Sequence, residues 1–489
     1  MRVYHYSKRG RVLSKNYWLS HCQVPDFDNP RQYQALDLWL KEGTIAGIYP
    51  TGAHPVPTGA EIVEGTNKLL LPGWVNAHTH SMEMWTRGLI PPLPLELWLA
   101  ELYAHPIQSL EQLYLAASLT AVETLLSGGT TVVDHLVLIP GQELESLAAA
   151  DRAYREAGIR AYIAPLIQDE AFEYSIPGGR QLEPMMPPMP TAEVLALMEA
   201  IVRKFHHPQD GIEIGIGPTG IQLCTDALFE GCIDLSDRHN LCRHGHLLET
   251  KAQEKLAQEK YGTSAVVHLA ELGWLSPKTS LAHCVWLDDR DIELMAETGT
   301  TVVHNPLSNL RLGSGIAPLL RYRDRGVNVS YGCDGAASND GQSLFEVLKI
   351  GSMLHNTTDF DYRNWISPQA ICRQASQGGA LGLNSKDYGR LEVGQSADLV
   401  LFNLDDLSLL PAADPLGQLI WGRPGNVVDS VWVRGKQVVA NGQPITVNVR
   451  QLSDRLRSYC EWLETRPLSP SPMRQQLEST YRQSMGLSQ

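Results

Sequence analysis

Short apolar runs alternate with amphipathic stretches through the middle of the chain, from about residue 69 to residue 335. Each run is typical of a buried strand, and the segments between them, such as Thr191–Phe205 and Asp289–Thr298, have the apolar spacing of helices. Strands that alternate with helices pair in parallel through right-handed crossovers. The predicted strands are Leu69–Ala77, Thr130–Leu138, Ile159–Leu166, Ile212–Ile216, His244–Leu248, Thr279–Leu287, Thr300–His304 and Val327–Tyr331. Such a series predicts an α/β fold in which residues 71–387 form a (β/α)8 barrel.

Both ends of the chain favour strands. Before about residue 70, Gly and Pro break the sequence into short apolar runs, and strands return after about residue 388. Neither end alone is large enough to bury a core, so we expect residues 1–70 and 388–448 to form one second domain, followed by a helical tail over residues 449–489. The predicted terminal strands include Thr44–Tyr49, Glu61–Val63, Asp398–Phe402, Val427–Val433 and Gln437–Val439.

Composition narrows the class of protein further. The 489 residues carry a net charge of −14, which disfavours nucleic acid and anionic membranes as partners. No apolar stretch reaches the roughly 18 residues of a membrane span, and no apolar run follows the basic N-terminal residues as it would in a signal peptide. The eight cysteines form no Cys-x-x-Cys pair, so free thiols are expected. A soluble cytoplasmic protein with a small-molecule substrate is therefore predicted.

The first predicted barrel strand ends in two histidines, His78 and His80. Residues two apart on a strand point to the same face, so both imidazoles can reach one ion. In a barrel, that end of the strand is where active sites are built. A lone His-x-His pair would equally fit two polar residues at a strand end, so the prediction depends on the other strands.

Ionisable residues end three further strands. The fifth carries His246 and Glu249, and His244 precedes His246 by two residues on the same face, so spacing alone does not choose between the two histidines. His283 ends the sixth strand and Asp334 ends the eighth. Chance would scatter such residues over both ends of the barrel, whereas these share one end. Three neutral imidazoles and one carboxylate suit zinc, with ferrous iron as the alternative.

Four longer motifs connect the sequence to a known family. They are Leu71-Pro-Gly-Trp-Val-Asn-Ala-His-Thr-His80 followed by Arg87-Gly88, His304-Asn-Pro-Leu-Ser-Asn309, Arg311-Leu-Gly-Ser-Gly-Ile-Ala-Pro318 and Gly389-Arg-Leu-Glu-Val-Gly-Gln-Ser-Ala-Asp-Leu399. From about residue 60 to 445, the chain resembles the chlorohydrolase and aminohydrolase group of the amidohydrolase superfamily. The resemblance implies a distorted TIM barrel, a small β-sandwich domain built from both chain ends, and a homo-oligomer, most simply a dimer.

The resemblance also implies the metal ligands. The family places its third metal histidine three residues before the acidic residue of the fifth strand, which selects His246 over His244. Relatives with two ions bridge them with a carbamylated lysine or a glutamate at the fourth strand, whereas this strand ends at Thr219 without a lysine and has Glu213 too early. We therefore expect one divalent ion, with Zn favoured over Fe. The expected ligands are His78, His80, His246 and Asp334.

In such a site the ion activates a water molecule for attack on an amidine-like carbon. The resemblance implies that Asp334 accepts the water proton and that His283 orients the water and stabilises charge. Glu249 would protonate a ring nitrogen and later deliver a proton to the leaving ammonia. The expected activity is that of a hydrolase of C–N bonds other than peptide bonds, a cyclic amidine deaminase.

The resemblance divides between two classes of substrate. One class is the nucleosides S-adenosylhomocysteine and methylthioadenosine, and the other is free heterocycles such as oxidised guanine, pterins and s-triazines. The nucleoside branch has a glutamate for the ribose hydroxyls where a gapless count from Trp98 gives Ile107, and a histidine where this chain has Thr219. We therefore expect a free aminated heterocycle, with a nucleoside deaminase or a chlorohydrolase as alternatives and an inactive scaffold barrel as a remote one.

The sequence offers two candidates for contact with the substrate, Trp85 and Thr219. Trp85 follows the first strand and is expected either to stack on a planar base or to belong to the core. Thr219 is a second candidate for contact with the substrate. If an insertion has moved the ribose glutamate, Glu101 or Glu111 would be its replacement.

Overall fold

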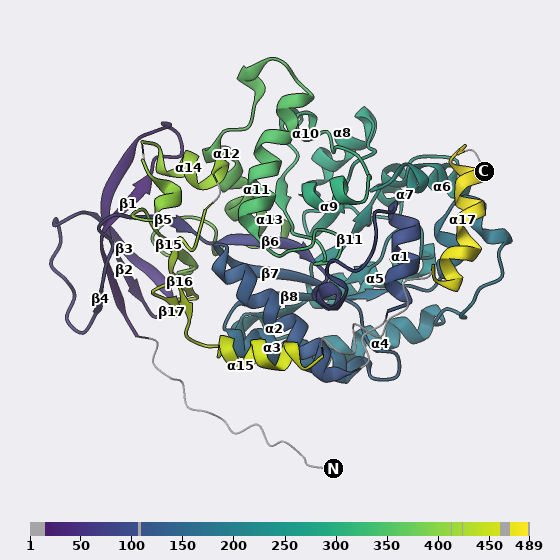
Figure 1. The fold of residues 1–489 in the computed structure, drawn as a ribbon, viewed down its shortest axis with the longest axis horizontal. Helices are drawn as coiled ribbons and strands as arrows, with labels where there is room; N and C mark the ends of the chain where they lie inside the picture. Colours follow the sequence, from purple (N-terminus) through teal and green to yellow (C-terminus); the bar gives the residue numbers. More distant parts are fainter. Residues whose placement is uncertain (1–14, 106–108, 412, 423, 460–469, 488–489) are drawn as a thin grey trace, which may run out of the picture.

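The computed structural model describes residues 15–105, 109–411, 413–422, 424–459 and 470–487. Parallel strands covered by helices form one part of the molecule, and a sheet made from both chain ends lies beside it, at the left in Figure 1. The prediction of an α/β fold with parallel strands is therefore confirmed.

The parallel strands follow the predicted order along the chain and form two sheets. The first contains β6 (Trp74–Thr79), β7 (Gly129–Leu136), β8 (Arg160–Ile167), β9 (Ile212–Ile214) and β10 (Gly217–Pro218), and the second contains β11 (Arg243–Leu247), β12 (Thr279–His283), β13 (Thr301–His304) and β14 (Val329–Tyr331). The sheets approach each other along both edges. Ile216 bridges to Arg243 in parallel, and the backbone N–H of Asp334 donates to the His78 carbonyl over 2.9 Å. The strand ladders themselves do not join β14 to β6 into a closed ring.

The strands from both chain ends are joined by hydrogen bonds into one nine-stranded sheet. Strand β5 pairs with β15 from the other end of the chain, which ties the two termini together. The run predicted as Leu69–Ala77 is in fact two strands: Gly73 separates β5 from β6, and the two enter different sheets. The sheet comprises β1 (Tyr17–Pro25), β2 (Tyr33–Lys41), β3 (Thr44–Pro50), β4 (Glu61–Glu64), β5 (Lys68–Pro72), β15 (Leu399–Asn403), β16 (Val428–Val433), β17 (Lys436–Ala440) and β18 (Gln443–Pro444).

Helices begin and end where local chemistry favours it. In α8 (Asp289–Thr298), Asp288 and Asp291 form a reciprocal capping box, and Gly299 ends the helix with φ +69°. The helix predicted over Thr191–Phe205 is α4. The other helices are α1 (Leu95–Tyr103), α2 (Leu110–Leu126), α3 (Glu143–Ala157), α5 (Asp226–His239), α6 (Lys251–Tyr261), α7 (Ala265–Glu271), α9 (Pro306–Arg311), α10 (Leu319–Asp324), α11 (Leu344–Met353), α12 (Pro368–Arg373), α13 (Gly379–Gly382), α14 (Pro415–Trp421), α15 (Val449–Arg457) and α17 (Pro472–Ser484).

The C-terminal helices return to the part of the molecule that carries the parallel strands. Helix α15 lies along α2, and α17 packs on α1 at the right of Figure 1. The side chain of Glu101 in α1 accepts a hydrogen bond from the Ser471 backbone over 3.1 Å and faces Arg474 of α17. Within the described ranges, no helix has both the length and the apolar character needed to cross a membrane, and the cysteines are free thiols.

Candidate metal centre and catalytic cavity

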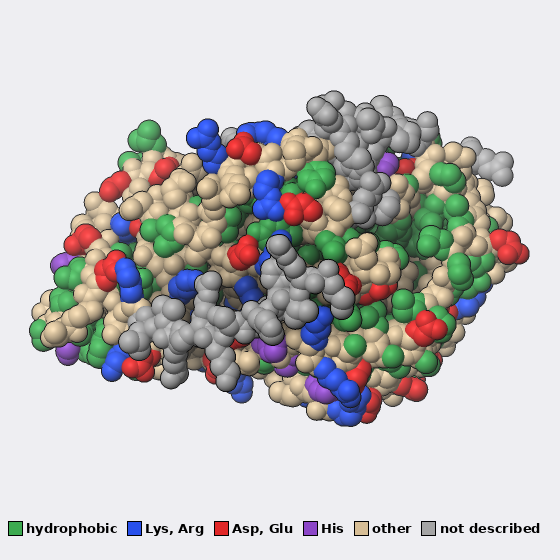
Figure 2. All heavy atoms as spheres, turned by 90° about the horizontal axis from the view of Figure 1, so that it is seen from below, with side chains coloured by type: hydrophobic (Ala, Val, Ile, Leu, Met, Phe, Trp, Pro, Cys, Tyr) green, Lys and Arg blue, Asp and Glu red, His purple; other side chains and the backbone are tan. Residues whose placement is uncertain are grey.

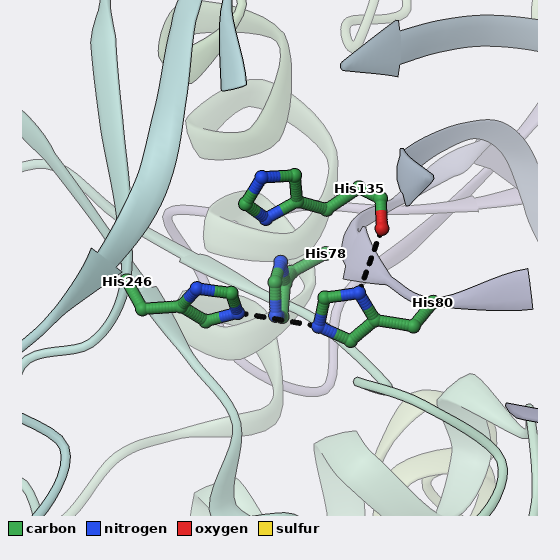
Figure 3. Close-up of side chains that lie close together, drawn as sticks. All are labelled: His78, His80, His135 and His246. Atoms are coloured by element: carbon green, nitrogen blue, oxygen red, sulfur yellow. Dashed lines mark hydrogen bonds between the residues drawn. The ribbon is translucent and has the colours of Figure 1, made fainter. Parts of the chain in front are cut away.

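Three of the predicted histidines converge at the C-terminal ends of β6 and β11 (Figure 3). The Nε2 atoms of His80 and His246 are 3.2 Å apart, and the His78 ring packs edge-on against both. His135, at the end of β7, completes a group of four whose candidate ligand atoms all lie within 4.8 Å of one another. A second group, of His78, His283 and Asp334, shares His78 with the first.

Hydrogen bonds to the far side of each ring leave lone pairs pointing inward. His80 Nδ1 lies 2.7 Å from the His135 carbonyl oxygen, and His246 Nδ1 lies 2.7 Å from the Thr219 carbonyl oxygen. A carbonyl only accepts, so each Nδ1 carries the proton and each Nε2 of the neutral ring is an acceptor. Two acceptors 3.2 Å apart repel each other unless a cation lies between them. The donor set therefore suits a divalent metal ion.

His244 points inward as well, but one layer below the cluster. Its Nε2 is 2.8 Å from His78 Nδ1, and its Nδ1 is 2.8 Å from the Ser280 hydroxyl. His244 thus contacts the far nitrogen of His78 and orients that ring, as second-layer partners of metal ligands commonly do. Of the two histidines left open by spacing, His246 is the one that faces His80.

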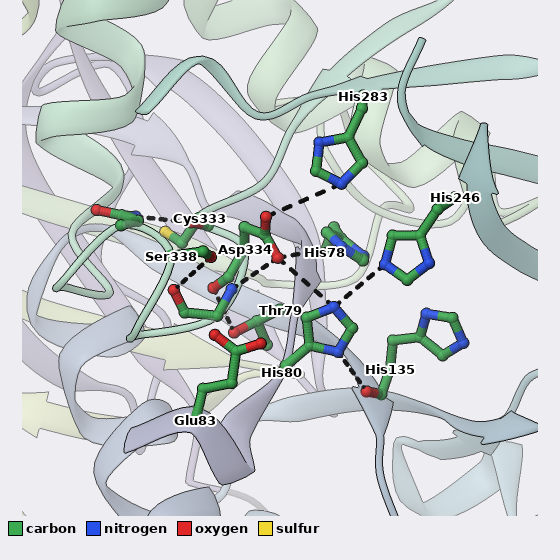
Figure 4. A network of polar contacts seen from close by, with 12 residues as sticks. His78, Thr79, His80, Glu83, His135, His246, His283, Cys333, Asp334 and Ser338 are labelled. Carbon is green, nitrogen blue, oxygen red and sulfur yellow. Dashed lines mark hydrogen bonds and ion pairs between the residues drawn. The ribbon is translucent and has the colours of Figure 1, made fainter. Parts of the chain in front are cut away.

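Carboxyl groups lie close to the imidazoles, and Figure 4 shows Asp334 beside His78, His80 and His283. Asp334 Oδ1 is 3.3 Å from His78 Nε2 and 3.5 Å from His80 Nε2. His283 Nε2 lies between two carboxyl groups, 3.4 Å from Glu249 Oε2 and 3.9 Å from Asp334 Oδ2. The Ser314 hydroxyl donates to Glu249 Oε1 over 2.9 Å, and Asn309 Oδ1 accepts from His283 Nδ1 over 2.8 Å. The predicted ligands and proton-transfer residues are thus brought together in one place.

Burial controls the protonation of these groups. It lowers the pKa of His78 to about 4 and holds the pKa of His246 well below its ordinary value, which keeps both rings neutral and able to bind a metal. Burial acts in the opposite direction on the Glu249 carboxyl and raises its pKa to about 7. A carboxyl with this pKa can both give and take a proton near neutral pH.

The backbone at the site is held in conformations that non-glycine residues rarely adopt. His283 has φ +73° and Asp334 has φ +61°. Left-handed conformations of this kind cost on the order of 1–3 kcal/mol each and persist where the surrounding structure enforces them, often at functional sites. From these backbone positions the His283 and Asp334 side chains approach each other to 3.9 Å.

A narrow cavity of about 60 Å³ opens over the cluster. Thr219, one of the two predicted substrate contacts, lines it. Trp85, the other, does not: its indole N–H donates to the Gln112 carbonyl over 2.9 Å and its ring packs edge-on against Tyr459 in the core. Trp85 thus lies in the hydrophobic core, the second of the two places expected for it. Trp98 of α1 lines the cavity instead.

The carboxylates suggested as ribose partners are engaged elsewhere. Glu101 is held by Ser471 and Arg474, and Glu111 pairs with Arg455. Neither lines the cavity. Ile107, on which the argument against a nucleoside was based, lies outside the described residues.

Two further residues at the site were missed by the sequence analysis. His135 ends a predicted strand, so the rule that identified His283 would also have identified His135. Glu83, three residues after His80, is buried in the cavity wall with its pKa raised well above the usual range by that burial. Its carboxylate packs so closely under the loop after Asp334 that a Cβ on Gly335 would lie 1.7 Å from Oε2.

Parallel strands that carry imidazoles and carboxylates at their C-terminal ends define a metal-dependent hydrolase. The chain belongs to the amidohydrolase family, whose model matches residues 69–438. Named relatives include deaminases of two kinds. A 5-methylthioadenosine/S-adenosylhomocysteine deaminase of Syntrophobacter fumaroxidans is 32% identical over 394 residues, covering 80% of this chain and 84% of that protein. An 8-oxoguanine deaminase of Pseudomonas aeruginosa is 31% identical over 432 residues, covering 86% and 93%.

Solved structures share the fold over nearly the whole chain. An adenosine deaminase from Xanthomonas campestris with bound zinc superimposes with a TM-score of 0.82 at 25% identity, covering 92% of this chain and 99% of that one. Zinc-bound atrazine chlorohydrolase from Arthrobacter aurescens gives a TM-score of 0.83 at 24% identity, covering 90% and 99%. The likeness to the chlorohydrolase shows the fold alone.

Proposed function

We propose that the protein is a metal-dependent hydrolytic deaminase of an aminated N-heterocycle. The proposal rests on one observation: imidazoles with inward-facing lone pairs are buried together with Asp334, His283 and Glu249, and the pKa of Glu249 is about 7. The deaminase names of relatives such as the 8-oxoguanine deaminase support the same activity. An inactive scaffold would not be expected to keep a strained backbone at both His283 and Asp334.

The proposed metal is one divalent ion, zinc in preference to iron. The proposed ligands are His78, His80, His246 and Asp334. Nitrogen-rich donor sets of this kind favour zinc, and the zinc bound to the similar adenosine deaminase structure supports that choice. When bound, the ion supplies a water molecule activated for attack near neutral pH.

The chain's own residues would carry the proton steps. Asp334 accepts the proton of the attacking water at a carboxylate oxygen. Glu249 in its protonated form donates to a ring nitrogen of the substrate and then supplies the amino group with the proton it needs to leave as ammonia. The Nε2 atom of His283 lies between the two carboxyl groups and can hold a proton there as it moves from one to the other.

Free heterocycles are the substrate class that we propose, in preference to nucleosides. With Glu101 and Glu111 bound to other partners, neither is available for a ribose diol. A hydroxyl that loses water without gaining a partner costs on the order of 1–3 kcal/mol.

We also propose that β6 to β14 close as a distorted barrel and that residues 1–70 and 388–448 form a separate domain, which the pairing of β5 with β15 supports.

The test is ammonia release by zinc-loaded protein from aminated purines, pterins and triazines, compared with S-adenosylhomocysteine. We expect a higher kcat/KM with a free heterocycle, and no release from Glu249→Gln protein. Glu271→Gln, which changes an exposed carboxylate at the end of α7, is the matched control and should keep full activity. A clear preference for the adenosyl thioether would contradict the choice of substrate class.

A further inference from the structure

A second and larger cavity adjoins the catalytic one. Its volume is about 600 Å³, against about 60 Å³ for the space over the metal cluster. The two cavities share a wall formed by Met82, Leu102, Tyr103, Val137 and Leu166. We call the larger cavity the annexe. Pockets that hold whole small molecules usually have volumes of about 300–1,000 Å³, so the annexe alone is in the range expected for most of a substrate.

The annexe is lined almost entirely by apolar side chains. Among the described residues that line it, the polar groups are Gln168, three glutamates and the phenol of Tyr103, and there is no Lys or Arg. Each glutamate already has a partner. Glu170 pairs with Arg180 and Lys260, Glu173 accepts from the Met185 backbone over 2.9 Å, and Glu143 accepts from the Gly141 backbone over 2.8 Å. The annexe therefore offers little to a charged or strongly polar group.

Flexible apolar residues form the outer wall. Met186 and Met189 come from the loop before α4, and Met473 comes from the C-terminal helix α17. Met186 is 69% exposed and Met189 is 38% exposed, so they lie at the rim. Hydrophobic side chains gather toward the end of the surface in Figure 2 that carries α1, α4 and α17. Methionine adapts its shape to an apolar ligand, which suits a wall that closes on a chain of variable length.

We propose that the substrate is an aminated heterocycle carrying an uncharged apolar arm of several carbon atoms, and that this arm lies in the annexe. The inference rests on the proposed function, because it is that function which puts the reacting ring over the metal cluster. The ring is placed in the cavity that His80, His246 and Asp334 line, and the arm extends past the shared wall into the annexe. Apolar surface that leaves water for such a space is favourable in proportion to its area. The annexe thus selects for the arm and the metal cluster acts on the ring.

A series of substrates tests the proposal on the unmodified protein. One aminated ring is compared with its ethyl, butyl and hexyl derivatives, and with a derivative of equal length that ends in a carboxylate. Each buried methylene should raise kcat/KM roughly fourfold until the annexe is filled, so a butyl group should gain on the order of 10²-fold. The carboxylate-ended arm should lose most of this gain. A kcat/KM that is flat or falls with arm length would overturn the inference.

Variants in the rim locate the effect. Met186→Glu with Met189→Glu should lower the ratio of kcat/KM for the butyl over the unsubstituted ring by at least about tenfold, because two charges now border the arm. Met185→Glu is the matched control: Met185 is 50% exposed on the same loop but does not line the annexe, and its ratio should not change. If the ratio of kcat/KM for the butyl over the unsubstituted ring is the same in both variants, the arm does not lie in the annexe. A ratio is unaffected by any loss of folded protein.

Binding separates this inference from the proposed function. Calorimetry of the unsubstituted and butyl rings with Glu249→Gln protein measures affinity without turnover. Tighter binding of the butyl ring by on the order of 10²-fold supports the annexe even if no ring is deaminated by the unmodified protein, an outcome that would contradict only the proposed function. Equal affinities would overturn the annexe whatever the activity.

Discussion

Replacing Glu249 by glutamine should stabilise the metal-free protein while abolishing its activity. The carboxyl is 2% exposed and burial raises its pKa from 4.5 to about 7. Glutamine has nearly the same shape. Its amide oxygen can accept from Ser314 as Glu249 Oε1 does, and its amide nitrogen can donate to His283 Nε2, the atom that faces Oε2. The substitution therefore removes an ionisable group with little change in packing.

The size of the effect follows from the pKa. A group that stays protonated in the folded state while it ionises in the unfolded state favours unfolding as the pH rises between the two pKa values. The protonated Glu249 carboxyl therefore costs the folded protein nothing below about pH 4.5. Between about pH 4.5 and about pH 7 the free energy of unfolding falls by about 1.4 kcal/mol for each pH unit. Glutamine does not titrate. Above pH 7, the free energy of unfolding of the variant should therefore be roughly 3 kcal/mol larger than that of the unmodified protein. At about pH 5 the two values should differ little.

Urea denaturation of the metal-free proteins at about pH 5 and about pH 8 measures the difference. Glu271→Gln, at an exposed carboxylate, should change stability by less than about 0.5 kcal/mol at either pH. In parallel, kcat of the zinc-loaded Glu249→Gln protein should fall by at least about 10²-fold, because the amide cannot transfer a proton. A stability difference that does not vary with pH would refute the account of a buried, protonated Glu249.

Further substitutions test the cluster and the cavity wall. His246→Ala should lose bound zinc on dialysis, measured by atomic absorption, whereas His54→Ala, at an exposed histidine, should retain it. His244→Ala should weaken zinc affinity by roughly 10–100-fold in a competition titration without changing the stoichiometry, because His244 only orients His78. Gly335→Ala puts a Cβ 1.7 Å from Glu83 Oε2, so the carboxylate must move; kcat/KM should fall by up to on the order of 10²-fold at normal metal content. Unchanged kinetics there would remove Glu83 from the list of residues that shape the cavity.

Local patterns in the sequence predict the parallel strands and their order well. The reason is physical: buried parallel strands are short continuous apolar runs, and helices such as α4 and α8 show their apolar spacing and their caps in the sequence. The position of His78, His283 and Asp334 at strand ends follows from the same patterns. The patterns do not show where one apolar run divides into two strands. The run from Leu69 to Ala77 divides at Gly73, and its two halves, β5 and β6, enter different sheets.

Side-chain partners were harder to predict because they depend on distant residues. Trp85 was expected either at the substrate or in the core, and its contacts with Gln112 and Tyr459 decide for the core. Glu101 is taken by the C-terminal tail, some 370 residues away in the sequence. Glu83 is buried by the loop after Asp334. The annexe does not follow from local patterns either, since its walls combine residues of α1, β8, α4 and α17 with those of several loops.

The most direct test of the central claim is the release of ammonia from an aminated heterocycle before and after the metal is removed. We expect one ammonia for each substrate consumed, loss of the activity in protein dialysed against a chelator, and recovery when about one zinc ion per chain is added back. Ammonia release at the full rate from the stripped protein, or consumption of the substrate without ammonia, would contradict the account.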